Sequence, residues 1–318
     1  MELGRGEMLV AFFSMALWIG GVTRVEAQLK VGFYSQSCPH AEAIVKEEIE
    51  KALGDDEGVG ADLLRMHFHD CFVRGCDGSI LLDSTNSSKA EKDAEINLTL
   101  EGFDIIDAVK EKLEAACRGV VSCADLLAFA ARDAVVHYGG IQYEVPSGRR
   151  DGKISVATDA DILPSPDSEL AALTHLFVSK GLSQADMIVL SGAHTVGIAH
   201  CDAFSERLYS AAPALEVEYA SELRKQCPRG SNNTAPMDPQ SPHKFDNGYY
   251  QLVLGDRALF TSDHALLSTQ GTAAQVKSLA GDYWGFQSKF AAAIVKMGAI
   301  GVLAGYDGEV RANCRVAN

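Results

Sequence analysis

The chain has 318 residues, enough for one large domain or for two half-domains that share a core. Its formal net charge of −15 argues against nucleic acid as a partner, because binding to phosphates needs a basic surface. The same charge argues against tight binding to acidic polysaccharides, since like charges repel.

The first 27 residues are typical of a secretory signal peptide. Arg5 precedes an apolar run from Met8 to Ile19, and Val25-Glu-Ala27 has the small-residue form of a cleavage site. The run is too short for a membrane span, and no later segment has the length of one. We therefore expect a signal peptide over residues 1–27 and a soluble mature domain over 28–318.

Apolar periodicity predicts that most of the mature chain is helical. Stripes at helical spacing run from Ile44 to Leu53 and from Phe103 to Leu113, and residues 242–254 and 287–297 have the same character. Extended segments are predicted to be few and short, at Tyr143–Pro146 and Gly308–Asn313.

Two serines predict helix starts. Ser122 and Ser183 are each followed three residues later by an aspartate, which is the spacing of a capping box. The first helix would run to about His137, and the second would carry residues 188–197.

All eight cysteines follow the predicted signal peptide, and an even count in an exported chain indicates four disulfides. Spacing alone leaves on the order of a hundred possible pairings. A metal cluster is the rival interpretation, but the sequence has no C-x-x-C pair. Sequons for N-glycosylation at Asn86, Asn97 and Asn232 are consistent with export.

The stretch from Ala61 to Ser79 carries the strongest sign of chemistry. Arg65 and His69 are four residues apart and share one face of a helix, with Phe68 beside them. A base, a fixed cation and a flat apolar wall would then face one pocket. This set suits peroxide cleavage, since the base can move a proton from the near oxygen to the far one while the guanidinium stabilises the developing charge.

Other interpretations of this stretch remain open from the residues alone. An isolated Arg-x-x-x-His more often only satisfies local carboxylates. A zinc site with His67 and His69 is conceivable, although helical geometry points these side chains apart. A calcium site is plausible, because hard oxygen ligands cluster just after the helix. These are the side chains of Asp70, Asp77 and Ser79 and the carbonyls of Val73 and Gly75.

The Ala61–Ser79 stretch resembles the distal helix of class III plant secretory peroxidases, and Ser191-Gly-Ala-His-Thr-Val-Gly197 resembles their proximal haem-ligand motif. The resemblance extends from Phe33 to Arg315. It implies a mostly α fold with little β, in which distal and proximal helical halves sandwich one haem b. It also implies an enzyme that reduces H₂O₂ to water and oxidises small phenolic donors in one-electron steps, through a ferryl iron and a porphyrin radical.

The resemblance assigns roles residue by residue. Arg65 would be the distal arginine and His69 the distal acid–base, with Asn97 holding the His69 imidazole in its useful tautomer. His194 would be the axial iron ligand, and Asp263 would accept the proton of its other ring nitrogen. That carboxylate would raise the basicity of the ligand. Phe68 and Pro164 would meet reducing substrates at the haem edge.

Two calcium ions and one disulfide pairing are also implied. The distal calcium would be bound by Asp70, Val73, Gly75, Asp77 and Ser79, with Glu91 contributing through water. The proximal calcium would be bound by Thr195, Asp238, Ser241, Lys244 and Asp246, with Lys244 giving only its carbonyl. The implied disulfides are Cys38–Cys117, Cys71–Cys76, Cys123–Cys314 and Cys201–Cys227.

The chain departs from the family pattern in several places. It is one residue shorter after Asn97, and Glu101 replaces a common arginine, so a local ion pair is lost or reversed. Tyr143 replaces the usual tryptophan. Asp167 occupies a haem-edge position that is often apolar, and Ser241 stands where threonine is usual.

Parts of the sequence are compatible with three functions from different classes: a peroxidase, a zinc hydrolase and a calcium-stabilised binding protein. A zinc hydrolase lacks the H-E-x-x-H motif and a clear third ligand. A calcium-stabilised binding protein without chemistry predicts the loss of Arg65, His69 or His194, and all three are present. We therefore favour a secreted, monomeric peroxidase without nucleic-acid or membrane partners. The short tail after Cys314 favours the extracellular space, in the cell wall or apoplast, over the vacuole.

Overall fold

The computed structural model describes Met1 and residues 29–210 and 215–318. The rest of the predicted signal peptide lies outside the described residues. None of the described helices is long and apolar enough to cross a bilayer. The α-helices are α1 (Ala41–Asp55), α2 (Val59–Val73), α3 (Phe103–Ala116), α4 (Cys123–His137), α5 (Leu170–Ser179), α6 (Gln184–Ser191), α7 (Ser205–Tyr209), α8 (Val217–Gln226), α9 (Gly248–Leu254), α10 (Thr261–His264), α11 (Gln270–Ala280) and α12 (Tyr283–Met297).

Short 3-10 helices and two strands complete the architecture. The 3-10 turns are η1 (Ser79–Leu81), η2 (Glu91–Asp93), η3 (Glu95–Asn97), η4 (Ala157–Ile162), η5 (Gly192–Thr195), η6 (Cys201–Phe204) and η7 (Ala265–Leu267). Strands β1 (Ile198–His200) and β2 (Thr234–Pro236) form a two-stranded sheet. The predicted mostly helical fold with little β is confirmed.

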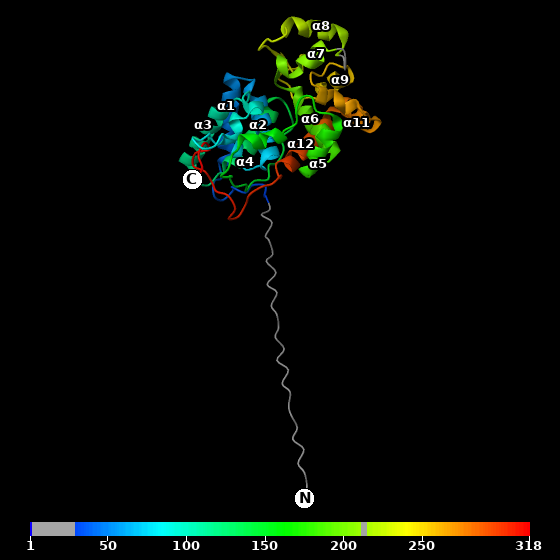
Figure 1. Ribbon diagram of the computed structural model, residues 1–318. Coiled ribbons are helices and arrows are strands. Elements are labelled where there is room, and N and C mark those ends of the chain that lie inside the picture. The colour runs from blue at the N-terminus through cyan, green and yellow to red at the C-terminus, as the bar shows by residue number, and fades with distance from the viewer. Residues whose placement is uncertain (2–28, 211–214) are drawn as a thin grey trace.

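Helices α1 to α4 form one half of the molecule, coloured blue to teal in Figure 1. The predicted stripe from Phe103 to Leu113 lies on α3, and its members Ile106, Val109 and Leu113 are buried. Helix α4 is buried on all sides from Cys123 to Val135, which is the pattern of a central helix. A core of apolar side chains from α1 to α4 holds this half together.

The second half contains α5, α6, α11 and α12, drawn in green, orange and red. Its core is continuous with side chains of the first half, because Phe72 of α2 and Val135 of α4 belong to the same cluster as Ile188 of α6 and Ile294 of α12. The two halves therefore share one hydrophobic core and form one packing unit.

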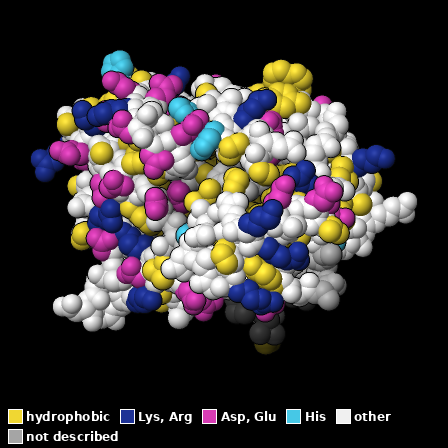
Figure 2. Space-filling view, turned by 90° about the horizontal axis from the view of Figure 1, so that it is seen from above, with side chains coloured by type: hydrophobic (Ala, Val, Ile, Leu, Met, Phe, Trp, Pro, Cys, Tyr) yellow, Lys and Arg dark blue, Asp and Glu magenta, His cyan; other side chains and the backbone are white. Residues whose placement is uncertain are grey.

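A smaller lobe carries α7, α8 and the sheet, at the top of Figure 1. Strands β1 and β2 pair antiparallel, with Ala199 opposite Ala235. A separate apolar cluster fills this lobe. Figure 2, a view of this end of the molecule, shows acidic and basic side chains interspersed over the surface.

The two predicted extended segments are free of helix but belong to no sheet. Residues 143–146 and 308–313 form no strand, since their surroundings offer only single bridges, Lys30 to Ser147 and Asp151 to Glu309. The true strands flank the segment that carries α7 and α8, and each has only three residues, which is too short for a periodic signal.

Two predicted helices are shorter than expected. Helix α6 ends at Ser191 and not near Gly197, because the Tyr250 hydroxyl contacts the carbonyls of Ile188 and Val189 at its last turn. Helix α9 begins only at Gly248, since the preceding segment folds around Asp238, whose carboxylate accepts a hydrogen bond from Gln240 N.

The two predicted capping boxes differ. At α6 the box is complete, with Ser183 and Asp186 each accepting from the backbone N–H of the other. At α4 only the Ser122 hydroxyl accepts, from Asp125 N. The Asp125 carboxylate is turned toward other partners, so this box is incomplete.

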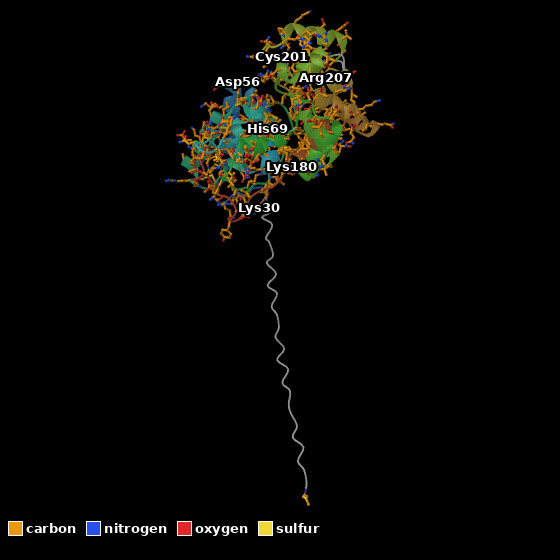
Figure 3. The ribbon with its side chains drawn as sticks, viewed as in Figure 1. Lys30, Asp56, His69, Lys180, Cys201 and Arg207 are labelled. Atoms are coloured by element: carbon orange, nitrogen blue, oxygen red, sulfur yellow. A yellow bond between two sulfur atoms is a disulfide. The ribbon has the colours of Figure 1, made fainter. Side chains whose placement is uncertain are left out.

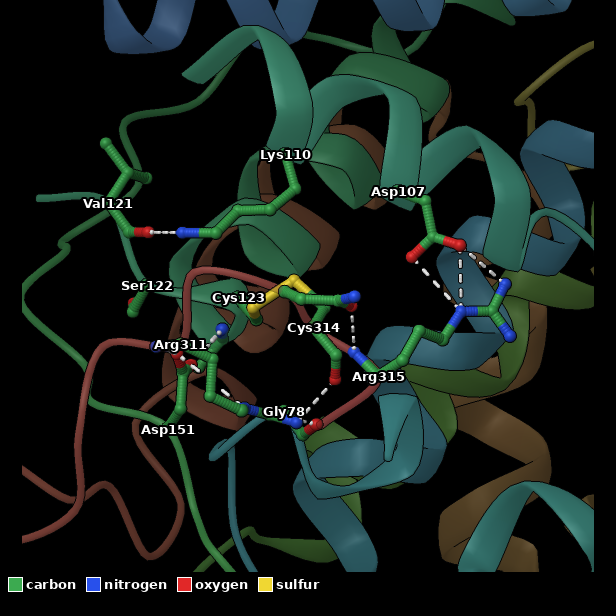
Figure 4. The surroundings of a disulfide bond; sticks show 12 residues. Gly78, Asp107, Lys110, Val121, Ser122, Cys123, Asp151, Arg311, Cys314 and Arg315 are labelled. Carbon is green, nitrogen blue, oxygen red and sulfur yellow. Dashed lines mark hydrogen bonds and ion pairs between the residues drawn. A yellow bond between two sulfur atoms is a disulfide. The ribbon is translucent and has the colours of Figure 1, made fainter. Parts of the chain in front are cut away.

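The eight cysteines form the four pairs that the resemblance implies: Cys38–Cys117, Cys71–Cys76, Cys123–Cys314 and Cys201–Cys227. Figure 4 shows the third pair tying the C-terminal segment to the start of α4. Beside it, Arg311 donates to the carbonyls of Gly78 and Cys314, and its own N–H donates to Asp151. The C-terminal segment is thereby fixed to the first half.

Asp125 is a fully buried carboxylate that joins three segments. It accepts hydrogen bonds from the Tyr34 hydroxyl at 2.7 Å, from Gly148 N at 2.6 Å and from Arg149 Nη1 at 2.7 Å. The Arg149 guanidinium is buried as well. Removing one partner of such a pair leaves an uncompensated buried charge.

We therefore predict that Asp125→Ala lowers the free energy of unfolding by about 3–5 kcal/mol. Ser122→Ala is the matched control on the same helix, because it removes only the cap and should cost about 1 kcal/mol. Denaturant titration measures both values. Equal losses in the two variants would contradict the role of the buried pair.

Candidate active site

His69 lies in the C-terminal half of α2, and its ring is buried between the two halves. Figure 3 shows His69 near the middle of the molecule. Its Nδ1 is 2.6 Å from Oδ1 of Asn97, and Nδ2 of Asn97 donates to the carbonyl of Glu91 at 2.7 Å. This second bond fixes the orientation of the amide, so Oδ1 faces the histidine.

The Asn97 bond determines the tautomer of His69. Because Oδ1 can only accept, Nδ1 carries the proton and Nε2 holds the free lone pair. Burial and the nearby Arg65 lower the pKa of His69 to about 3, against a smaller opposing effect of the Asn97 bond. The ring is therefore neutral at physiological pH, with Nε2 available as a base.

Arg65 lies one turn before His69 on the same face of α2. Its Nη1 donates to the Thr99 hydroxyl at 2.9 Å and its Nη2 to the carbonyl of Ile96 at 2.7 Å. Burial lowers the pKa of Arg65, yet an arginine remains protonated in proteins. The segment from Ile96 to Thr99 thus holds a permanent cation beside His69.

Phe68 forms a flat apolar surface next to His69. The two ring centroids are 5.4 Å apart, and Phe68 packs in turn against Phe72 and Phe177 at 4.5 and 6.4 Å. These contacts limit the rotation of Phe68. The three side chains expected to share one face of α2 therefore do so.

His194 lies on η5, directly after α6, and comes from the other half of the molecule. Its Nδ1 is 2.8 Å from Oδ1 of Asp263 on α10, and its side chain is 40% exposed. Asp263 also accepts from the Tyr249 hydroxyl at 2.8 Å and from Phe260 N at 3.2 Å. Three donors keep this carboxylate fixed, and in the neutral tautomer with its proton on Nδ1 the lone pair of His194 lies on Nε2.

A group of buried acidic side chains lies at the C-terminal end of α2. Asp70, Asp77 and Glu91 are all buried, and Ser79 Oγ donates to Glu91 at 3.3 Å. Burial, reinforced by repulsion from Asp77, raises the pKa of Asp70 well above its usual range and that of Glu91 to about 8. Oε1 of Glu91 has no hydrogen-bond partner within the described ranges and only a distant ion pair, 3.9 Å from Arg74.

A second oxygen-rich group lies beside His194. The Thr195 hydroxyl is 3.2 Å from Oδ1 of Asp246, and the Ser241 hydroxyl is 3.3 Å from Oδ2 of Asp238. A Cβ on Gly248 would lie 2.3 Å from Asp238 and 2.8 Å from Asp246, so both carboxylates converge on this glycine. The Lys244 ammonium is exposed and lies 3.6 Å from Asp246.

The zinc interpretation finds no support. His67 contacts the sulfur of Cys71 at 3.7 Å and lines a cavity of about 10 Å³ with Tyr143 and Arg149. His69 faces Asn97 instead. Within the described ranges, no three His, Cys, Asp or Glu side chains are grouped to hold a metal by themselves.

The positions that depart from the family pattern are distributed around the site. Glu101 is exposed, next to the segment that holds Arg65. Tyr143 has a buried hydroxyl without a partner in the described part of the chain. Pro164 is half-buried and Asp167 exposed, on a loop fixed to α10 by the bond from Ser262 N to the carbonyl of Pro166.

The three sequons differ in accessibility. Asn86 and Asn232 are exposed, whereas Asn97 is 1% exposed and its Nδ2 is occupied by the Glu91 carbonyl. The folded chain leaves no space for a glycan on Asn97.

Sequence reasoning missed three residues that support the two histidines. Thr99 anchors Arg65, and Tyr249 anchors Asp263. Arg207, labelled in Figure 3, is a buried cation attracted by Asp263 and Asp256. These contacts are long-range in the sequence, so only an alignment with covariation could have indicated them.

Comparison with known proteins assigns the chain to a family. The family model described as Peroxidase matches residues 45–282. Peroxidase 5 of Vitis vinifera is 54% identical over 92% of this chain and 93% of the relative. Peroxidase 3 of Arabidopsis thaliana is 48% identical, over 94% and 95%. Peroxidase 1 of Oryza sativa subsp. japonica is 46% identical, over 96% and 98%.

These matches cover most of the chain and agree with the helical fold. They confirm the family expected from the motifs around Arg65 and His194. The protein is therefore an enzyme of the oxidoreductase type, and it belongs to the class III plant haem peroxidases.

Proposed function

We propose that Arg65 and His69 activate H₂O₂ on one side of a haem b, and that His194 is the axial iron ligand on the other. The main support for the proposal is that the two imidazoles have the same hydrogen-bonding arrangement. Each Nδ1 is held by an oxygen acceptor, Asn97 for one and Asp263 for the other, and each Nε2 is left free. One ring can then serve as a base and the other as a ligand.

The residues around His194 fit a haem. A neutral imidazole nitrogen is a common axial ligand, and a carboxylate that accepts from the other nitrogen makes the ligand more basic. Asp263 has the geometry for this, since it accepts from Nδ1 at 2.8 Å. When bound, haem supplies the iron at which the O–O bond breaks and holds the oxidising equivalents that donors later remove.

His69 is proposed to move one proton. Nε2 accepts it from the peroxide oxygen nearer the iron and delivers it to the outer oxygen, which leaves as water. The low pKa of about 3 keeps the acceptor form populated, and Asn97 keeps the lone pair on Nε2. The base is restored when the proton is delivered.

Arg65 is proposed to stabilise the negative charge that develops on the outer oxygen as the bond breaks. Two of its N–H groups are tied to Thr99 and Ile96, so the cation needs little reorganisation during the reaction. Phe68 would exclude water from one side.

The donors are proposed to be small phenolics, such as lignin precursors, oxidised one electron at a time. Pro164 and Phe68 are proposed to contact them. The exposed carboxylate of Asp167 on the same loop would weaken stacking of neutral aromatic donors. Roles in phenolic and lignin oxidation and in the response to oxidative stress are proposed by family resemblance.

Two calcium ions are proposed to neutralise the acidic groups. The distal ion would be bound by Asp70, Val73, Gly75, Asp77 and Ser79, with Glu91 through water. Its support is a set of buried carboxylates and the unpartnered Oε1 of Glu91, because buried charges need a partner or a metal. The proximal ion would be bound by Thr195, Asp238, Ser241, Asp246 and the carbonyl of Lys244.

The mature enzyme is proposed to comprise residues 28–318, to act as a monomer, and to be exported to the cell wall after removal of residues 1–27. The four disulfides support an oxidising compartment. Glycans are proposed on Asn86 and Asn232, which are exposed.

We predict that His69→Ala slows peroxide cleavage by about two to four orders of magnitude while haem stays bound. His67→Ala is the matched control, because His67 lies two residues away and faces a different cavity. Its rate should equal that of the wild type. Stopped-flow absorbance of the haem after mixing with H₂O₂ measures both rates.

Two outcomes would count against this role of His69. One is an unchanged rate in His69→Ala, and the other is an equal loss in His67→Ala. The wild-type rate should also fall as the pH drops through about 3, where His69 takes up a proton. The sign follows from the lowered pKa, since the basic form predominates above it.

We predict that calcium chelation lowers both activity and stability. With calcium at about a hundred times its Kd, each site adds about 3 kcal/mol to the free energy of unfolding. Asp246→Asn should remove only the proximal ion and halve the calcium content, which elemental analysis measures. A protein that keeps its melting temperature in excess chelator would refute both sites.

A further inference from the structure

Trp284 is the only tryptophan of the predicted mature chain, and it lies on the surface. It is the second residue of α12, and its side chain is 69% exposed. Such exposure is unusual, because tryptophan is highly buried on average. The neighbouring Tyr283 packs edge-on against it, with the two ring centroids 5.0 Å apart. Two rings that can be oxidised therefore lie together at the start of α12.

The interior of α12 connects this pair to the centre of the molecule. Phe286 follows Tyr283 by one helical turn and is fully buried. Its ring centroid is 5.4 Å from that of Tyr250 on α9. A Cβ on Gly192 would lie 2.5 Å from Phe286, so this ring also contacts the backbone of η5, two residues before His194. Phe286 thus lies between the surface pair and the segment that carries the histidine.

Two buried tyrosines complete the connection to His194. The ring centroids of Tyr250 and Tyr249 are 5.0 Å apart, and that of Tyr249 is 5.8 Å from the imidazole. The Tyr249 hydroxyl donates to Oδ1 of Asp263, the same atom that lies 2.8 Å from Nδ1 of His194. A row of aromatic side chains therefore leads from the surface to this histidine. In order, the members of this aromatic row are Trp284, Tyr283, Phe286, Tyr250 and Tyr249.

We propose that Trp284 is a second site of donor oxidation, where aromatic donors too large for the haem edge give up one electron. The electron passes along the aromatic row to the haem held by His194. Electron tunnelling falls off steeply with distance, so a row of neighbouring rings is a favourable route. The proposal rests on the function proposed above and adds a class of donor to it. These donors are phenolic polymers, which can stack on an exposed indole but cannot enter a pocket between the two halves.

Each cycle at this site transfers one electron. Trp284 gives an electron to the oxidised haem and its indole proton to water, since the exposed ring borders solvent. The indolyl radical then takes an electron from a phenolic hydroxyl group and a proton from water, and the phenol loses its own proton to water. The donor leaves as a phenoxyl radical, and one of the oxidising equivalents supplied by H₂O₂ is consumed. In total, one electron reaches the haem and one proton enters the solvent.

Two donors distinguish this site from the haem edge in the holoenzyme. Guaiacol is a small phenol, whereas a soluble phenolic polymer freed of small molecules by gel filtration cannot reach the haem edge. We expect Trp284→Phe to lower kcat for the polymer by about tenfold, or about 1.4 kcal/mol in activation free energy, and to leave guaiacol oxidation unchanged. Tyr306→Phe is the matched control. Tyr306 is fully exposed but lies outside the aromatic row, so both rates should equal those of the wild type.

Phe286→Leu tests the aromatic row separately from the surface. It leaves Trp284 and Tyr283 in place to bind the polymer, but it removes the ring that contacts Tyr250. We expect kcat for the polymer to fall as in Trp284→Phe, while KM for the polymer and the guaiacol rate stay unchanged. If Trp284 only bound the polymer, Phe286→Leu would keep its kcat, and that result contradicts the proposed route.

The radical itself gives a readout that does not depend on turnover. When the holoenzyme is mixed with H₂O₂ without a donor and frozen, electron paramagnetic resonance should detect an indolyl radical. Its hyperfine pattern should change when the protein is produced with ring-deuterated tryptophan, and Trp284→Phe should lack the signal. This measurement needs no Phe286 variant, so it stands even if Phe286→Leu fails to fold.

The proposal is overturned if the wild type shows no signal that responds to deuterated tryptophan. It is also overturned if Trp284→Phe oxidises the polymer at the wild-type rate. A wild-type protein that oxidises neither guaiacol nor the polymer would instead contradict the proposed function itself, so the two failures are distinguishable.

Discussion

The hydrogen bond from the Nδ1 of each histidine to a fixed oxygen is the constraint on which the site depends. A neutral imidazole has one donor and one acceptor nitrogen. An acceptor oxygen next to Nδ1 keeps the proton on Nδ1 and makes Nε2 the acceptor nitrogen. Asn97 and Asp263 each place an acceptor oxygen at the Nδ1 of their histidine. Each of these two side chains is itself held by further hydrogen bonds. A protonated Nε2 on either ring could act neither as a base nor as a ligand.

Those partners are positioned by the two packed halves. Asn97 ends η3, far from His69 in sequence, and Asp263 lies 69 residues after His194. The bond of His69 joins α2 to η3, and the bond of His194 joins η5 to α10. Helices α2 and α6, which precede or carry the two histidines, contribute side chains to one continuous core.

The sequence predicted features that depend on residues close together in the chain, but not those that depend on contacts between distant segments. The shared face of Arg65, His69 and Phe68 follows from helical spacing, and the cap at Ser183 from a four-residue pattern. The last residue of α6 and the first residue of α9 could not be predicted, because they depend on contacts made by Tyr250 and Asp238. Motif resemblance supplied the partners Asn97 and Asp263, whereas no motif indicated that Thr99 holds Arg65 or that Tyr249 holds Asp263.

The charged side chains around His69 differ from those around His194. Around α2, burial and the cation Arg65 act together to lower the pKa of His69. On the other side Arg207 is buried, and its guanidinium has no hydrogen-bond partner among the residues that the structure describes. Because arginine stays protonated, a permanent cation lies near the Asp263 carboxylate that accepts from His194. Each histidine therefore has a cation in its surroundings, Arg65 on the side of His69 and Arg207 on the side of His194.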